Sequence, residues 1–196
     1  MNMSFDTVVQ DIQDRLGVAV RSRKSPMHTP VIGTSDGDLR VMVLREFNAA
    51  TYQLRLHTDA RSPKIGRIAN DPAMAVLAYD AEAKVQIRVR GVGAVKTTGA
   101  DIDAIWDEAT NFAKRCYLAE QGPSSVSARQ TSGLPGWAEG INPTADQIAP
   151  ARQNFAVLYI TVTEFDWLYL ANTGHRRARI TILPDRAGWK GEWLVP

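Results

Sequence analysis

The sequence predicts a mainly β (α+β) domain, in which antiparallel strands form a barrel with helices at its periphery. Short strand patterns follow one another through brief turns, and strands and helices do not alternate regularly as a parallel sheet requires. The chain of 196 residues is long enough for one substantial core, and no Pro/Gly/Ser-rich linker divides it. We therefore expect a single domain over residues 1–196.

The expected elements of the first part follow from hydrophobic periodicity. Val8, Ile12 and Leu16 share one helical face after Ser4, a favoured N-cap. Gly91 and Gly93 interrupt a strand of alternating polarity, which indicates a bulge or a close backbone approach. The pattern predicts a helix over 4–16, strands over 31–34, 39–47 and 52–58, a helix over 62–70, and strands over 73–79 and 84–96.

The second part is expected to begin with a helix over 101–119, whose apolar spacing places Cys116 in the core. Four prolines between residues 120 and 150 predict a long irregular loop, and loops of that length are commonly lids or binding segments. Four closing strands are predicted over 153–163, 165–172, 175–183 and 189–194.

Composition excludes several classes of function. No apolar run approaches the roughly 20 residues of a membrane helix, and the N-terminus lacks a secretory pattern, so we expect a cytoplasmic protein with no membrane partner. A net charge of +2, with 21 acidic among 23 basic residues, gives no basic stripe for nucleic acid. One cysteine and three well-separated histidines predict no metal site.

A phosphate site is predicted where the strand over 52–58 runs into the helix over 62–70. Ser62 is a favoured N-cap and Pro63 suits the first helical position. Arg61 and Lys64 add positive charge beside free backbone N–H groups, which is typical of an anion site. The same pattern also fits an ordinary surface helix that begins with basic residues. Any phosphate bound here is expected on a small molecule.

Four motifs occur in a fixed order along the chain. They are Arg40-Val41-Met42-Val43-Leu44-Arg45, His57-Thr58 with Ser62-Pro63-Lys64, Gln86-Ile87-Arg88-Val89-Arg90-Gly91, and a closing set of Phe165-Asp166-Trp167, His175-Arg176-Arg177, Trp189 and Trp193 to Pro196. Together, over residues 31–196, they resemble the pyridoxamine 5′-phosphate oxidase-like, FMN-binding split barrels. Arg45 stands where that family usually has lysine, and Pro63 where it has arginine.

The resemblance implies an antiparallel Greek-key split β-barrel that binds FMN at the interface of a homodimer. It implies phosphate contacts from the first two motifs and contacts to the flavin ring from Gln86, Trp167 and Arg177. The residues expected to bind the cofactor are Arg40, Val41, Val43, Arg45, His57, Thr58, Arg61, Ser62, Lys64, Gln86, Arg88, Trp167 and Arg177. The resemblance also fits the charge of the phosphate, which arginine and lysine side chains pair well.

The substrate residues of the vitamin B6 enzymes are only partly present, because Thr173 replaces the arginine of an Arg-x-His pair while His175 remains. Our leading hypothesis is an FMN-dependent oxidoreductase acting on an unidentified small molecule, with His175 and Arg177 as catalytic residues. Two alternatives stay open. One is a non-catalytic flavin-binding or sensing protein. The other is a split barrel that uses deazaflavin F420 or haem.

Overall fold

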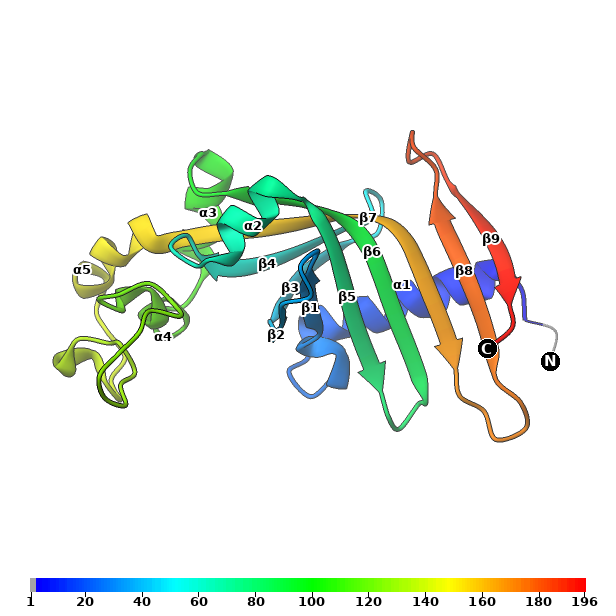
Figure 1. Cartoon of the computed structure of the whole chain (residues 1–196), viewed down its shortest axis with the longest axis horizontal. Helices are drawn as coiled ribbons and strands as arrows, with labels where there is room; N and C mark the ends of the chain where they lie inside the picture. Colours follow the sequence, from blue (N-terminus) through cyan, green and yellow to red (C-terminus); the bar gives the residue numbers. More distant parts are fainter. Residues whose placement is uncertain (1–2) are drawn as a thin grey trace.

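The computed structural model describes residues 3–196 and contains one nine-stranded antiparallel sheet that curls into a barrel (Figure 1). The strand order is β2-β1-β5-β6-β7-β4-β3, and β8 and β9 extend the sheet from β7. The strands are β1 (Val31–Thr34), β2 (Leu39–Val41), β3 (Leu44–Asn48), β4 (Gln53–Asp59), β5 (Ala73–Asp80), β6 (Val85–Lys96), β7 (Phe155–Tyr169), β8 (Arg176–Ile182) and β9 (Trp189–Leu194). The predicted fold class is confirmed.

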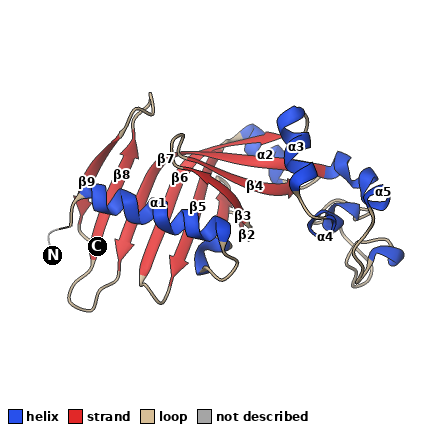
Figure 2. Cartoon of the chain, turned by 180° about the vertical axis from the view of Figure 1, so that it is seen from behind, coloured by secondary structure: helices blue, strands red, loops and turns tan. Residues whose placement is uncertain are grey.

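Helices lie at the periphery, as the sequence predicts. The α-helices are α1 (Phe5–Arg21), α2 (Lys64–Asn70), α3 (Ala100–Glu108), α4 (Asn111–Lys114) and α5 (Ala145–Ile148), with 3₁₀ turns at Pro26–His28, Arg115–Leu118, Gly136–Ala138 and Ala149–Asn154. Figure 2 shows α1 lying across one face of the sheet, while α3, α4 and α5 gather at the opposite end of the molecule. None of the helices described is both long and apolar enough to cross a membrane.

The barrel closes through the stretch predicted as one strand over 39–47. The structure divides this stretch into β2, which pairs with β1 at one edge of the sheet, and β3, which pairs with β4 at the other. Met42 lies in the link between them, and its N–H donates to the carbonyl of Pro30 at 3.1 Å. One continuous segment therefore joins the two edges, and the prediction of a single strand is wrong.

The strands predicted over 153–163 and 165–172 are one strand, β7. It pairs with β6 from Val157 to Tyr169, with β4 in its first half and with β8 in its second. The pairing register shifts between Arg90 and Gly91, and a Cβ at Gly91 would lie 2.6 Å from the carbonyl oxygen of Thr161. Only glycine allows that approach, so the predicted bulge is confirmed at Gly91.

The main core lies between the sheet and α1. Val85, Ile87 and Val89 of β6 are buried, whereas Arg88 and Arg90 between them are exposed, as their alternation predicts. The buried face of α1 comprises Val8, Ile12, Leu16 and Ala19.

Helix α1 begins at the predicted cap, where the Ser4 hydroxyl accepts a hydrogen bond from the N–H of Thr7 at 3.2 Å. It continues through Gly17 to Arg21, so the predicted end at residue 16 is too early. Packing of the apolar face outweighs the low helix propensity of one glycine.

A second, smaller core lies beneath α3, α5 and the 3₁₀ turns around them. Trp106, Tyr117 and Phe155 pack there with ring centroids 5.2–5.9 Å apart. The helix predicted over 101–119 ends at Glu108, because Thr110 is extended and caps α4 through its side chain. This break leaves Cys116 exposed, so its predicted core position is wrong. The predicted loop over 120–150 also contains α5, which a Thr144–Gln147 capping box begins.

Candidate functional site

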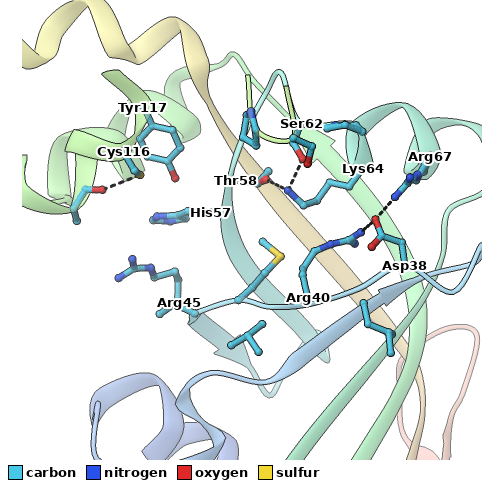
Figure 3. A pocket seen from close by; sticks show the side chains of 18 residues that line it. Asp38, Arg40, Arg45, His57, Thr58, Ser62, Lys64, Arg67, Cys116 and Tyr117 are labelled. Atoms are coloured by element: carbon cyan, nitrogen blue, oxygen red, sulfur yellow. Dashed lines mark hydrogen bonds and ion pairs between the residues drawn. The ribbon is translucent and has the colours of Figure 1, made fainter. Parts of the chain in front are cut away.

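A pocket of about 590 Å³ opens where β2, β3, the end of β4 and the start of α2 meet (Figure 3). Residues from the segment 113–124 form its other wall. We call it the cationic pocket, since three arginines and one lysine line it. It is lined by Asp38, Leu39, Arg40, Val41, Met42, Val43, Arg45, His57, Thr58, Ser62, Pro63, Lys64, Arg67, Ala113, Cys116, Tyr117, Pro123 and Ser124.

Lys64 is fixed at the centre of the pocket. Its ammonium group donates to the hydroxyls of Thr58 and Ser62, each at 2.8 Å. An ammonium carries three N–H donors, so one remains for a ligand. Burial, and after it the charge of Arg40, lower the pKa of Lys64. Both causes disfavour the charged form of Lys64. An anion beside Lys64 would favour that charged form and so offset them.

One edge of Arg40 is also available to a ligand. Its Nη2 donates to Asp38, which also accepts from Nη1 of Arg67. Its Nη1 is buried and has no hydrogen-bond partner among the described residues. Figure 3 shows Arg40 and Lys64 reaching toward the same part of the pocket from β2 and α2.

The opposite end of the pocket contains Arg45, His57, Cys116 and Tyr117 (Figure 3). Burial, followed by the charges of Arg45 and Arg55, lowers the pKa of His57 to about 3. His57 is therefore neutral at physiological pH. Nε2 of His57 and Nε of Arg45 are both buried, and neither has a partner within residues 3–196.

These features fit a phosphate-bearing cofactor. Buried polar atoms in proteins are nearly always hydrogen-bonded, and three buried nitrogen atoms that lack a partner in the described part of the chain border this one pocket. Two of them belong to arginines, and Lys64 lies between the two ends. Guanidinium and ammonium groups are the usual partners of phosphate oxygens.

The structure brings together many of the residues predicted to bind a cofactor. Eight of them line the cationic pocket: Arg40, Val41, Val43, Arg45, His57, Thr58, Ser62 and Lys64. The predicted cap is wrong, however. Pro63 occupies the N-cap position without a side-chain hydrogen bond, and the Ser62 hydroxyl binds Lys64 instead. Because α2 has only seven residues, side-chain cations rather than a helix terminus supply the positive charge.

Arg61, also predicted to bind the phosphate, is not among the residues lining the pocket. Its guanidinium binds both carboxylate oxygens of Asp59, at 3.0 and 2.7 Å, and donates to the carbonyl of Ala119 at 2.8 Å. The Arg61 side chain thus anchors the segment after the 3₁₀ turn at Arg115–Leu118 to the end of β4. We leave Arg61 out of the proposed site.

Gln86, Arg88 and Arg177 lie on the outer face of β6 and β8 and do not line the cationic pocket. Arg88 and Arg177 both donate to Asp166 on β7. Burial would raise the pKa of Asp166, but the hydrogen bonds from Arg177 and Arg88 outweigh it and lower that pKa. His175 is exposed in the turn between β7 and β8.

Trp167 is 2% exposed and does not line the cationic pocket. It packs beneath α1, where its indole N–H donates to the Asp11 carboxylate at 2.7 Å. This geometry supports a core role, so we also leave Trp167 out of the proposed site.

The residues predicted to bind the cofactor leave out several that line the pocket, including Asp38, Arg67, Met42 and Tyr117. Two of these had a usable signal. Arg67 follows Lys64 by three positions on a helix, which places the two side chains on one face. Asp38 precedes Arg40 by two positions at the start of a strand, so they share a side of it. Tyr117 had none, since the break after α3 determines its position.

Comparison with known proteins gives one family. Residues 17–97 match the model of the pyridoxamine 5′-phosphate oxidase FMN-binding domain. This segment contains the first three motifs and all the pocket residues contributed by β2, β3, β4 and α2. No curated protein sequence gives a significant match.

Solved structures share the fold over the whole chain. A pyridoxamine 5′-phosphate oxidase-related, FMN-binding protein from Nostoc punctiforme PCC 73102 has a TM-score of 0.69 and 21% identity, covering 100% of both chains. PhzG from Burkholderia lata 383, in complex with tetrahydrophenazine-1-carboxylic acid, has a TM-score of 0.67 and 17% identity, covering 100% of this chain and 94% of that one. At these identities the likeness establishes the fold.

Proposed function

The chain belongs, through residues 17–97, to the family of pyridoxamine 5′-phosphate oxidase FMN-binding domains, and we propose that it binds FMN in the cationic pocket and acts as an oxidoreductase. One observation carries the proposal. Three buried nitrogen atoms that have no hydrogen-bond partner within residues 3–196, on Arg40, Arg45 and His57, border one pocket together with Lys64. A cofactor with a phosphate group would satisfy them.

The phosphate of FMN is proposed to lie between Arg40 and Lys64. The free Nη1 of Arg40 and the remaining N–H of Lys64 can each donate to a phosphate oxygen. The hydroxyls of Thr58 and Ser62 hold Lys64 in place, so little side-chain entropy is lost when the phosphate binds.

The flavin ring is proposed to lie between two copies of the chain. Gln86 and Arg177, which are expected at the flavin ring, and the predicted cofactor residue Arg88 are on the outer face of the sheet, so one protomer alone leaves the site incomplete. The same face exposes four large apolar side chains, Leu39, Val41, Leu77 and Tyr79, with exposed fractions of 66%, 64%, 39% and 42%. A second copy packed there would cover this patch and bring the outer residues to the pocket.

Bound FMN would supply two-electron redox chemistry toward a small organic donor. The chain's own side chains would bind the cofactor and orient the substrate. Arg177, held by Asp166, would place positive charge near the pyrimidine edge of the ring, where negative charge develops. His175 would orient the substrate from the exposed turn. Neutral His57 would offer a hydrogen bond without adding charge.

A non-catalytic flavin-binding protein is the second candidate. Thr173 lacks the cation that would bind a phosphorylated substrate, and both Arg88 and Arg177 are paired with Asp166. Steady turnover of any reduced donor would exclude it. The absorption spectrum and mass of the co-purified ligand would separate FMN from F420 and haem.

The proposal is tested by titrating the purified protein with FMN and following flavin fluorescence. We expect quenching, and we expect Lys64→Ala to weaken FMN binding by about 1.5–3 kcal/mol, because it removes a charged hydrogen bond. Lys190→Ala, at a side chain 71% exposed on β9, is the matched control and should bind as the wild type does. Equal affinity in both variants would refute the role of Lys64, and absence of quenching would refute FMN binding.

A further inference from the structure

Two carboxylates from the turn between β1 and β2 form ion pairs with arginines of the pocket. Asp38 accepts hydrogen bonds from Arg40 and Arg67, and Asp36 pairs with Nε of Arg67 at 3.0 Å. Figure 3 shows Asp38 between the two guanidinium groups. Asp38 lines the pocket, whereas Asp36 does not.

These carboxylates divide the cations into two groups. Lys64 forms no ion pair with a carboxylate within residues 3–196, and Arg40 has one such pair and a free Nη1. Arg67 forms ion pairs with two carboxylates, those of Asp36 and Asp38. On the side of the pocket that faces Arg67, unneutralised positive charge is thus concentrated at Lys64 and Arg40, while Arg45 at the opposite end also has no carboxylate partner within residues 3–196. The pocket continues to Arg67, but there the charge is already balanced.

We propose that Asp38 is a specificity-determining residue, which restricts this cation cluster to a single phosphate group and so favours a phosphomonoester over a diphosphate. The inference rests on the proposed phosphate position between Arg40 and Lys64. A second phosphate extending toward Arg67 would meet the Asp38 carboxylate, and the two negative charges would repel each other.

The turn holds Asp38 in place. The Thr34 hydroxyl donates to Asp36 at 2.6 Å, and the N–H of Thr34 donates to the carbonyl of Asp38 at 3.2 Å. Gly37, with φ of 81°, supplies the left-handed backbone that the turn requires. Moving Asp38 away from the pocket would break these contacts and would leave Arg40 and Arg67 without their shared partner.

The experiment compares inorganic phosphate with pyrophosphate, using calorimetry on the flavin-free protein and competition against FMN. In the wild type, pyrophosphate should bind no more than about threefold better than phosphate. In Asp38→Asn, which keeps the shape and removes the charge, pyrophosphate should gain at least about tenfold while phosphate changes by less than about threefold. Asp36→Asn is the matched control, since it removes a charge from the same turn outside the pocket but leaves the Asp38 carboxylate on both Arg40 and Arg67, and the ratio should change by less than about threefold.

An unchanged ratio in Asp38→Asn, or an equal gain in Asp36→Asn, would overturn the inference. So would a wild-type protein that already prefers pyrophosphate by about tenfold. Circular dichroism would report whether Asp38→Asn folds. If it does not, the ratio of the two affinities in the wild type and in Asp38→Ser tests the inference instead. Calorimetry with the two anions needs no flavin. The inference can therefore fail while FMN still binds, and FMN binding can fail while the anion ratio is still read.

Discussion

His57 combines a polar ring with a buried position beside two arginines. It packs edge-on against Phe155, with ring centroids 5.0 Å apart, and the charges of Arg45 and Arg55 add to the effect of burial. In the folded protein it stays neutral down to a pH of about 3, whereas an ordinary histidine takes up a proton near pH 6.5. The folded protein therefore binds fewer protons than the unfolded chain between these two values.

The stability of the protein should consequently rise with pH from about 3 to 6.5 through His57. We expect His57→Gln to flatten this part of the profile, because glutamine does not titrate. The measurement is the free energy of unfolding in urea at several pH values across that window. Parallel profiles for the variant and the wild type would show that folding does not lower the pKa of His57.

At the scale of residues, sequence reasoning found the cations of the pocket more readily than their surroundings. Lys64 is predicted from the local strand-to-helix pattern, and Arg40 and Thr58 are predicted from the resemblance of their motifs to the family. Arg61, also predicted, lies outside the pocket, since its guanidinium binds the neighbouring Asp59 and the distant carbonyl of Ala119. A contact with a residue 58 positions away leaves no trace in local periodicity.

Helix α1 shows how packing extends an element beyond its local signals. Gly17 lies inside the helix, followed by the buried Ala19. A Cβ at Gly17 would meet only the end of the flexible Arg21 side chain, at 3.3 Å. The position therefore has room for alanine.

Gly17→Ala should raise the free energy of unfolding by about 0.5–1 kcal/mol, because alanine loses less backbone entropy in a helix. Gly37→Ala is the contrasting variant. Its φ of 81° disfavours alanine, and we expect it to lower that free energy by about 1–2 kcal/mol. Urea denaturation of both variants measures the two effects. A loss of stability in Gly17→Ala would mean that Arg21 cannot move aside.

Most strands and their turns could be predicted, because alternation along β5 and β6 reports the buried face directly. Two elements could not. The segment 39–47 reads as one strand, and its division at Met42 depends on which partners its two halves find. Likewise the sequence of β7 predicts two strands, and only its pairing with β6 from Val157 to Tyr169 shows that it is continuous. Both errors involve long-range pairing.

For the whole molecule, the main prediction concerns the division of the cofactor site between two copies. Lys64 and Arg177 lie in different places on one protomer, and the proposed dimer brings them to one flavin. Lys64→Ala and Arg177→Gln should therefore each weaken FMN binding in separate homodimers. After subunit exchange between the two variants, about a quarter of the sites should regain wild-type affinity, since a mixed dimer contains one intact site.

Fluorescence titration of the exchanged mixture, with native mass spectrometry to count subunits, measures this recovery. If Lys64 and Arg177 act on one flavin within the same chain, every site keeps a defect and no recovery occurs. A monomeric protein that binds FMN with full affinity would also contradict the prediction.

The link at Met42 has a consequence for motion of the barrel. Both flanking strands lie at edges of the sheet, and the pocket lies directly over their junction. Edge strands are where native proteins open locally and exchange amide hydrogens fastest. A ligand held jointly by Arg40 on β2 and Lys64 on α2 would oppose such opening, so occupancy of the pocket would slow exchange on both edges of the barrel at once.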